Sequence, residues 1–254
     1  MLVLKVMTVQ SAAIRILVEA LKEILTDANI EFTSEGMKVV KMDSSHTVLV
    51  HLKLNAENFE YYECVRPLTI GINMINFFKL IRTIGNDDTL TLFIEDDKMG
   101  VLGIRIENGD KNSVTNYKLH LMEIDEESIS IPVARFESVI TLPSIDFQKI
   151  VKDMSNLSDA IEIKSYGSKL IFSCTGDFAQ QETIIGEAQF GISFTEKSEG
   201  IVQGIFSAKH LVSFTKCTNL CNSIEMYLKN DYPLIIKYTC ASLGSLKLKQ
   251  GFKS

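Results

Sequence analysis

The 254-residue sequence repeats one arrangement of helices and strands. Four segments carry apolar residues at helical spacing: residues 11–25, residues 73–84, a segment that begins at Pro143 and Ser144, and residues 207–217. When Ser11 is aligned with Ser144, the apolar positions of the first and third segments coincide, pairing Ile14 with Phe147, Leu17 with Ile150, Val18 with Val151 and Leu21 with Met154. The second and fourth segments align at nearly the same offset, with Arg82 over Lys216. The repeat predicts an α+β chain of two similar domains, each with strands and two helices.

Most of the remaining sequence is typical of β-strands. Stretches such as DDTLTLFIED, AIEIKS, SKLIFSC and PLIIKYT are rich in Val, Ile, Leu and Thr, and many alternate apolar with polar residues. We also interpret VVKMDSSHTVLVHLKL as extended. Between the two copies lies LHLMEIDEESISIPVARF, a connector without a regular pattern, whose length is typical of a linker or a functional loop. We therefore predict an N-terminal domain at residues 1–118, a connector at 119–134 and a C-terminal domain at 135–254.

The charge of the chain is unevenly distributed. The formal net charge of −6, taken alone, argues against a general nucleic-acid binder. All four helical segments nevertheless offer basic residues, namely Arg15, Lys22, Lys79, Arg82, Lys149, Lys152, Lys209, His210 and Lys216. On a single helix such residues ordinarily form a solvated face. On four helices of an acidic protein, the same arrangement suits binding to a phosphate backbone without reading of the bases.

The sequence gives little support for a metal site, a cofactor or a membrane segment. The five cysteines include no Cys-x-x-Cys pair and no nearby histidine that would complete a zinc site, so we expect buried thiols, no metal and no cofactor. The apolar runs are short and broken by polar residues, and the N-terminal segment lacks the order of a signal peptide. We expect an intracellular protein with no membrane partner.

Asp43, Ser44, Ser45 and His46 are the residue types of a hydrolytic triad. A triad requires a serine and a histidine held together in space, and neighbouring side chains of an extended segment point to opposite sides. The sequence also has no Gly-x-Ser-x-Gly elbow. We therefore expect no enzymatic activity from this cluster.

The strand that follows the cluster places one apolar residue on its polar side. Val48, Val50, Leu52 and Leu54 share the face that we expect to be core, whereas Leu49 lies on the opposite face with His51 and Lys53. Together with Ile129 and Ile131 of the connector, Leu49 can form an exposed apolar patch that binds a partner.

Several stretches together resemble proliferating cell nuclear antigen, the family of DNA sliding clamps. They are KMDSSHTVLVHLKL, IGNDDTLTL, YKLHLMEIDEESISIP, VKDMSNLSDAIEI and YPLIIKYTCASLGSLK, and the similarity is collinear from about residue 2 to about residue 250. The resemblance implies the clamp fold, in which antiparallel sheets pack on two helices in each domain, and three chains that close head to tail into a pseudo-sixfold ring. It implies no catalysis. It further implies that the ring encircles duplex DNA, serves as a polymerase processivity factor and docks replication and repair proteins, in the nucleus or at a viral replication site.

The resemblance also implies roles for individual residues. The DNA-facing positions of the family match Arg15, Lys22, Lys79, Arg82, Lys149, Lys152, Lys209 and Lys216. The pocket that binds partner peptides matches Met42, His46, Thr47, Leu49, Ile129, Ile131 and Pro233. The subunit interface matches two strands. One contains Val114 and Tyr117, and the other contains Thr183 and Ile185. This chain departs from the family at Ile16, where a basic residue is usual, and at Lys249, where the pocket usually has a tyrosine.

Two alternatives to a homotrimeric clamp remain open at this point. The chain can be one subunit of a mixed ring, or a scaffold that binds DNA without encircling it. The interface strands would distinguish these possibilities, and their sequence alone does not.

Overall fold

The computed structural model describes residues 1–125, 129, 131 and 134–251. The chain divides into two compact units. Unit 1 comprises Met1–Lys41, His51–Ile129 and Thr239–Leu246, and unit 2 comprises Met42–Val50, Ser130–Tyr238 and Lys247–Ser254. No helix in the described part of the chain has the length and apolar character needed to cross a membrane.

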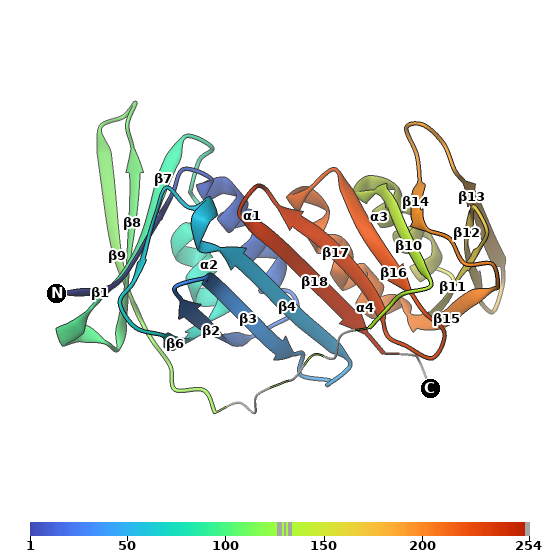
Figure 1. The fold of residues 1–254 in the computed structure, drawn as a ribbon, viewed down its shortest axis with the longest axis horizontal. Coiled ribbons are helices and arrows are strands. Elements are labelled where there is room, and N and C mark those ends of the chain that lie inside the picture. The colour runs from blue at the N-terminus through green and yellow to red at the C-terminus, as the bar shows by residue number, and fades with distance from the viewer. Residues whose placement is uncertain (126–128, 130, 132–133, 252–254) are drawn as a thin grey trace. The chain divides into compact units, whose positions relative to one another are not determined.

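The first half of the chain contains nine strands and two α-helices among its described residues (Figure 1). In chain order these are β1 (Leu2–Thr8), α1 (Ser11–Leu21), β2 (Asp27–Thr33), β3 (Gly36–Met42), β4 (Val48–Asn55), β5 (Tyr61–Cys64), β6 (Leu68–Asn73), α2 (Met74–Ile81), β7 (Asp88–Glu95), β8 (Val101–Asn108) and β9 (Ser113–His120). Short 3₁₀ turns lie at Ala56–Asn58 and Asp96–Lys98.

The second half repeats this order of elements among its described residues. It contains β10 (Ser138–Pro143), α3 (Ser144–Ser155), β11 (Ala160–Tyr166), β12 (Lys169–Thr175), β13 (Gln180–Gly186), β14 (Ser193–Glu196), β15 (Val202–Ser207), α4 (Ala208–Phe214), β16 (Ser223–Leu228), β17 (Leu234–Cys240) and β18 (Gly244–Gln250), with a 3₁₀ helix at Thr215–Leu220.

The pairing of the strands also repeats. The order β5-β1-β7-β8-β9 in the first half corresponds to β14-β10-β16-β17-β18 in the second, and the order β4-β3-β2-β6 corresponds to β13-β12-β11-β15. The registers that the structure gives for these pairs are antiparallel. The predicted α+β fold of two similar domains is thereby confirmed.

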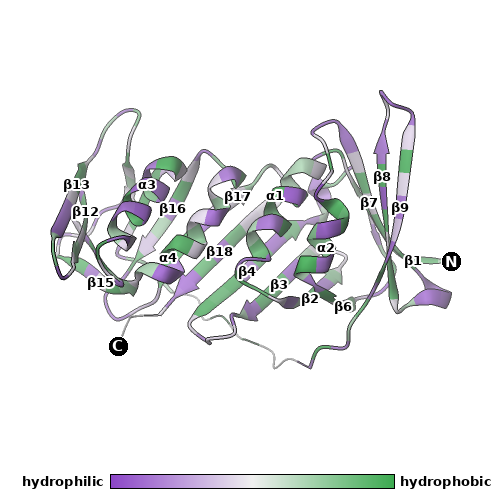
Figure 2. Ribbon diagram, turned by 180° about the vertical axis from the view of Figure 1, so that it is seen from behind, coloured by the Kyte–Doolittle hydropathy of each residue, from purple (hydrophilic) through white to green (hydrophobic). Residues whose placement is uncertain are grey.

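In each unit the helices cover one face of the sheets. They lie behind the strands in Figure 1 and in front of them in Figure 2, where each helix carries both hydrophilic and hydrophobic residues. In unit 1 they bury Ile14 and Phe77, and in unit 2 they bury Phe147 and Leu211. We call the opposite face of each sheet its outer face.

The first helix of each half is held by equivalent hydrogen bonds. Ser11 Oγ donates to the carbonyl oxygen of Asp88 at 2.5 Å, and Ser144 Oγ donates to the carbonyl oxygen of Cys221 at 2.6 Å. Each acceptor lies at or just before the strand that follows the second helix of its half. The alignment of Ser11 with Ser144 in the sequence therefore corresponds to an equivalence in the structure.

Three of the helices are shorter than the apolar spacing predicted. Helix α1 ends at Leu21 because the next turn tightens, with the amide N–H groups of Glu23 and Ile24 donating to Ala20 and Leu21 three residues back. Helix α2 covers Met74–Ile81, and its N-terminus is capped by Asn73, whose side chain accepts from the amide of Asn76 at 2.9 Å. Helix α4 ends at Phe214, where the 3₁₀ helix begins.

Candidate functional site

The helices of unit 1 present two exposed cations and two that are engaged. Lys79 and Arg82 are exposed, and neither forms an ion pair within the described part of the chain. Arg15 lies half-buried, 4.0 Å from Glu19. Lys22 pairs with Glu23, and its Nζ lies 5.0 Å from the centroid of the Phe78 ring. The guanidinium of Arg82 and the ammonium of Lys79 are thus the most available of the four cations on the helices of this unit.

The helices of unit 2 present four exposed lysines, Lys149, Lys152, Lys209 and Lys216, and none of them has an ion-pair partner among the residues that the structure describes. Helix α3 contacts α4 and the 3₁₀ helix that follows it, and Gln148 Nε2 donates to the carbonyl oxygen of Thr215 at 3.1 Å. Flexible side chains on rigid supports can attract phosphate oxygens without fixing a register on the bases.

The segment from Asp43 to Thr47 is a tight turn, and our interpretation of residues 39–54 as continuously extended is wrong. Strand β3 ends at Met42 and β4 begins at Val48. The carboxylate of Asp43 accepts hydrogen bonds from the amides of Thr47 at 2.9 Å and Val48 at 2.8 Å and from Ser45 Oγ. Burial alone would raise the pKa of Asp43, but these hydrogen bonds outweigh it and lower the pKa below its usual value.

The turn also determines how the residue types of a hydrolytic triad, Asp43, Ser45 and His46, lie relative to one another. Ser45 Oγ donates to Asp43 instead of to His46, and His46 adopts a left-handed backbone with φ of 54°. The sequence signal that could have revealed the turn is the run Asp-Ser-Ser between two apolar alternations, because such residues favour turns over strands.

The residues expected in the peptide-binding pocket come from separate segments of the chain. His46 and Thr47 lie on the β3–β4 turn, Met42 and Leu49 on the strands that flank it, and Pro233 just before β17. Six belong to unit 2, where Met42, Thr47, Leu49, Ile131 and Pro233 are half-buried and His46 is exposed. Ile129 belongs to unit 1 and is 37% exposed. Leu49 lies on the outer face, because its neighbours Val48 and Val50 are buried.

An aromatic cluster beside Pro233 was missed in the sequence. The ring of Phe136 lies 5.3 Å from that of Tyr227 and 5.5 Å from that of Tyr232, measured between centroids. In the sequence, only Tyr227 gives a hint of this cluster, because it alternates with the apolar residues of its strand and is therefore expected to point outward. Phe136 and Tyr232 come from loops that carry no periodic pattern.

The residues expected at the subunit interface lie on two sheet edges. Strands β9 and β13 are the last strands of their sheets, and each pairs on one side only within the described structure. Val114 on β9 is 50% exposed, while Tyr117 on β9 and both Thr183 and Ile185 on β13 are half-buried. Both edges are therefore open to pairing with a strand of another molecule.

The described residues contain no group of three or more His, Cys, Asp or Glu side chains that could hold a metal ion. Cys174, Cys217 and Cys240 are buried as expected, whereas Cys64 and Cys221 are only half-buried.

Comparison with known proteins matches both halves of the chain to one family. The N-terminal domain of proliferating cell nuclear antigen matches residues 1–129, and its C-terminal domain matches residues 130–250. The chain is 37% identical over 244 residues to a protein named probable DNA polymerase sliding clamp 1 from Paramecium bursaria Chlorella virus 1, a match that covers 94% of this chain and 93% of the relative. It is 32% identical, with the same coverage, to proliferating cell nuclear antigen from Chaetomium thermophilum. The chain belongs to the proliferating cell nuclear antigen family of DNA sliding clamps.

Proposed function

We propose that three copies of this chain close head to tail into a ring that encircles duplex DNA and acts as a polymerase processivity factor. The observation that carries the proposal is the position of the two unpaired edges in the internal repeat. Strand β9 is the counterpart of β18, and β13 is the counterpart of β4. Head-to-tail contacts between two different surfaces generate a ring when the rotation closes.

Strands β4 and β18 pair within the chain. By the internal repeat, the same kind of pairing is expected between the corresponding strands of two chains. The amide of Asn55 donates to Leu243 at 2.9 Å in unit 1, and the amide of Gly251 donates to Thr47 at 3.3 Å in unit 2. By the repeat, β13 of one copy is expected to pair with β9 of the next. The interface would then include Val114, Tyr117, Thr183 and Ile185.

The exposed cations of the helices support contact with DNA. Lys79, Arg82, Lys149, Lys152, Lys209 and Lys216 are exposed on helices or directly after them. Arg15 and Lys22 would contribute to the same potential from half-buried positions. Because phosphate contacts carry no sequence information, such a lining holds the ring on DNA and lets it slide.

Docking, not catalysis, is the proposed role of the β3–β4 turn and the connector. Met42, His46, Thr47, Leu49, Ile129, Ile131 and Pro233 would receive peptides from a DNA polymerase, a clamp loader and other replication or repair proteins. The proposed place of action is the nucleus or a viral replication site, in keeping with relatives from Chaetomium thermophilum and from a Chlorella virus.

The test is the native mass of the purified chain at micromolar and nanomolar concentrations, followed by retention on DNA. We expect a mass three times that of the chain that persists on dilution. A loaded ring should remain on circular DNA in high salt and be lost once the circle is cut, because only a topological link resists screening of charge. A monomer at every concentration would contradict the homotrimer and favour a mixed ring, and equal retention on cut and intact DNA would favour a scaffold that does not encircle DNA.

A further inference from the structure

Strand β18 turns two lysines toward the outer face of unit 2. Leu246, Leu248 and Gln250 are fully buried against the core, whereas Lys247 and Lys249 alternate with them and are half-buried. Side chains at alternate positions of a strand share one face, so the two ammonium groups lie on the same side.

Lys249 is the cross-strand neighbour of Leu49. The hydrogen bond from the amide of Gly251 to the carbonyl oxygen of Thr47 places these two residues opposite each other. Two residues further along the antiparallel strands, Lys249 faces Leu49, and such pairs have Cβ atoms about 5 Å apart. The ammonium of Lys249 therefore borders the apolar residue on which the proposed docking surface depends.

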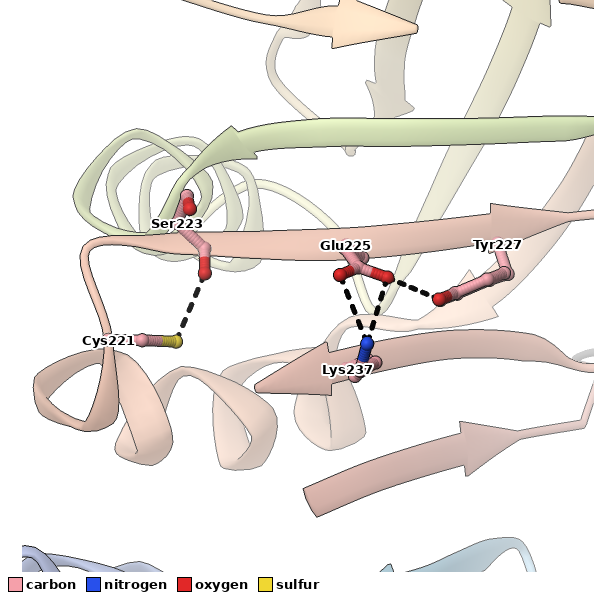
Figure 3. A network of polar contacts seen from close by, with 5 residues as sticks. All are labelled: Cys221, Ser223, Glu225, Tyr227 and Lys237. Atoms are coloured by element: carbon pink, nitrogen blue, oxygen red, sulfur yellow. Dashed lines mark hydrogen bonds and ion pairs between the residues drawn. The ribbon is translucent and has the colours of Figure 1, made fainter. Parts of the chain in front are cut away.

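One carboxylate of this face, that of Glu225, is already engaged. Glu225 accepts from Lys237 Nζ at 3.1 and 3.2 Å and from Tyr227 Oη (Figure 3). Lys247 also contributes to lowering the pKa of Glu225, so it too lies within the field of this carboxylate. The charge of Glu225 is thus shared between two lysines other than Lys249.

Lys249 has no ion-pair or hydrogen-bond partner among the residues that the structure describes. Burial, followed by repulsion from Lys247, lowers the pKa of its ammonium group. Both effects penalise the charged form, and an external anion would relieve both. An ammonium held in this position costs free energy in the unliganded protein that a bound carboxylate would recover.

The surroundings of Lys249 favour a peptide over a simple anion. On the same outer face, Tyr227 lies opposite Ile235, which is only 5% exposed, and Phe136 packs on Tyr227. Apolar and aromatic side chains beside a cation that has no described partner suit a ligand that has an apolar anchor and a carboxylate close to it.

We infer that Lys249 selects partner peptides that carry an aspartate or glutamate side chain next to their apolar anchor. The inference rests on the proposed docking function and specifies it. Its occupant is a peptide segment of a partner protein, bound with the carboxylate against Lys249 and the anchor against Leu49.

Selection from a displayed library of random peptides on the full-length protein tests the inference, with Lys249→Gln and Lys249→Arg as variants. Peptides recovered on the unmodified protein and on Lys249→Arg should share one acidic position, and those recovered on Lys249→Gln should lack it. Changing that acid to its amide should weaken binding about tenfold on the unmodified protein. The same change should have an effect of about twofold or less on Lys249→Gln. Lys53→Gln, which removes an exposed lysine of β4, is the control for net charge.

Exchanging the two charges, with a lysine on the peptide and a glutamate at position 249, distinguishes a direct contact from the general electrostatic field of the protein. A peptide with lysine at the selected position should bind Lys249→Glu better than it binds the unmodified protein. Peptides that lose affinity on Leu49→Ser but show no acidic preference would overturn the role of Lys249 and leave docking intact. Peptides that bind Leu49→Ser and the unmodified protein equally well would show that the docking surface lies elsewhere, and the proposed docking function would fail with it.

Discussion

The carboxylate of Asp43 organises the β3–β4 turn through hydrogen bonds from two backbone amides and one hydroxyl group. The left-handed backbone of His46 costs about 1 kcal/mol for a residue with a Cβ atom. The bonds to Asp43, together with the 3.0 Å bond from the amide of His46 to the carbonyl oxygen of Asp43, offset that cost. One side chain thus positions the turn that carries His46 and Thr47.

Replacing Asp43 by alanine should lower the free energy of unfolding by about 1–2 kcal/mol, because two backbone amides lose their acceptor. Urea unfolding at neutral pH measures the change. The matched control is Ser44→Ala, since Ser44 is exposed in the same turn, and its unfolding should match that of the unmodified protein. Equal stability of the Asp43 and Ser44 variants would show that the carboxylate does not hold the turn.

The stabilisation by Asp43 should depend on pH in a defined direction. The pKa of Asp43 is lowered in the folded protein relative to its ordinary value of 3.8, so its contribution is complete above about pH 3.8 and is lost as the pH falls through the folded pKa. The difference in unfolding free energy between the unmodified protein and Asp43→Ala should therefore shrink on acidification. A difference that grows toward low pH would contradict the assigned hydrogen bonds.

At the scale of elements, the helices of each unit bury one face and expose cations on the other. Helix α2 buries Met74, Phe77 and Ile81 and exposes Lys79, with Arg82 exposed directly after it. Helix α3 buries Phe147 and Val151 and exposes Lys149 and Lys152. The packing fixes the orientation of each helix, and this orientation decides which lysines can reach a ligand.

Changing Lys79, Arg82, Lys149 and Lys152 to alanine should weaken DNA binding and clamp-dependent DNA synthesis. Each lost phosphate contact should reduce the slope of log affinity against log salt by about 0.9. The measurement is a salt titration of binding to duplex DNA. An unchanged slope would contradict the basic lining.

The control for these helices is a set of exposed lysines on other elements. Changing Lys38, Lys53, Lys98 and Lys169 to alanine removes the same charge from the chain, and all four are exposed off the α-helices. This variant should keep the salt slope of the unmodified protein, because local phosphate contacts, and not net charge, set the slope.

At the scale of the whole molecule, the two sheet edges β9 and β13 are expected to set the assembly state. Changing Thr183 and Ile185 to lysine should convert the proposed trimer into monomers, since charges would be buried without partners in the joint. Native mass spectrometry measures the assembly, and circular dichroism reports whether the strands remain. Ile205→Lys is the control, because Ile205 is 49% exposed on β15 at the opposite edge of the same sheet. A trimer that survives both lysine substitutions would place the interface elsewhere.

The sequence could predict the repeat, the four helices and most strands because these depend on periodic apolar patterns. It missed the tight turn at Asp43 and the early end of α1, where side-chain hydrogen bonds and tightened backbone bonds override periodicity. From the sequence, Arg15 and Lys79 were equally strong candidates for contact with DNA, although Glu19 lies within reach of Arg15 in the structure. The environment of Lys249 depends on a strand some two hundred residues earlier, and no local pattern encodes such a pairing.

The return of β18 to β4 has a consequence for how the chain is made. Thr239–Leu246 belongs to unit 1, so the unit whose strands come first in the chain is completed only after most of unit 2 has been synthesised. Until then β4 lacks its neighbour and presents an unpaired edge, the kind of surface on which nascent chains aggregate. We expect residues 1–129 alone to be unstable, because unit 1 is incomplete until Thr239–Leu246 has been synthesised. Synthesis of β18, and not of the first half alone, is thus expected to be the step at which unit 1 becomes native.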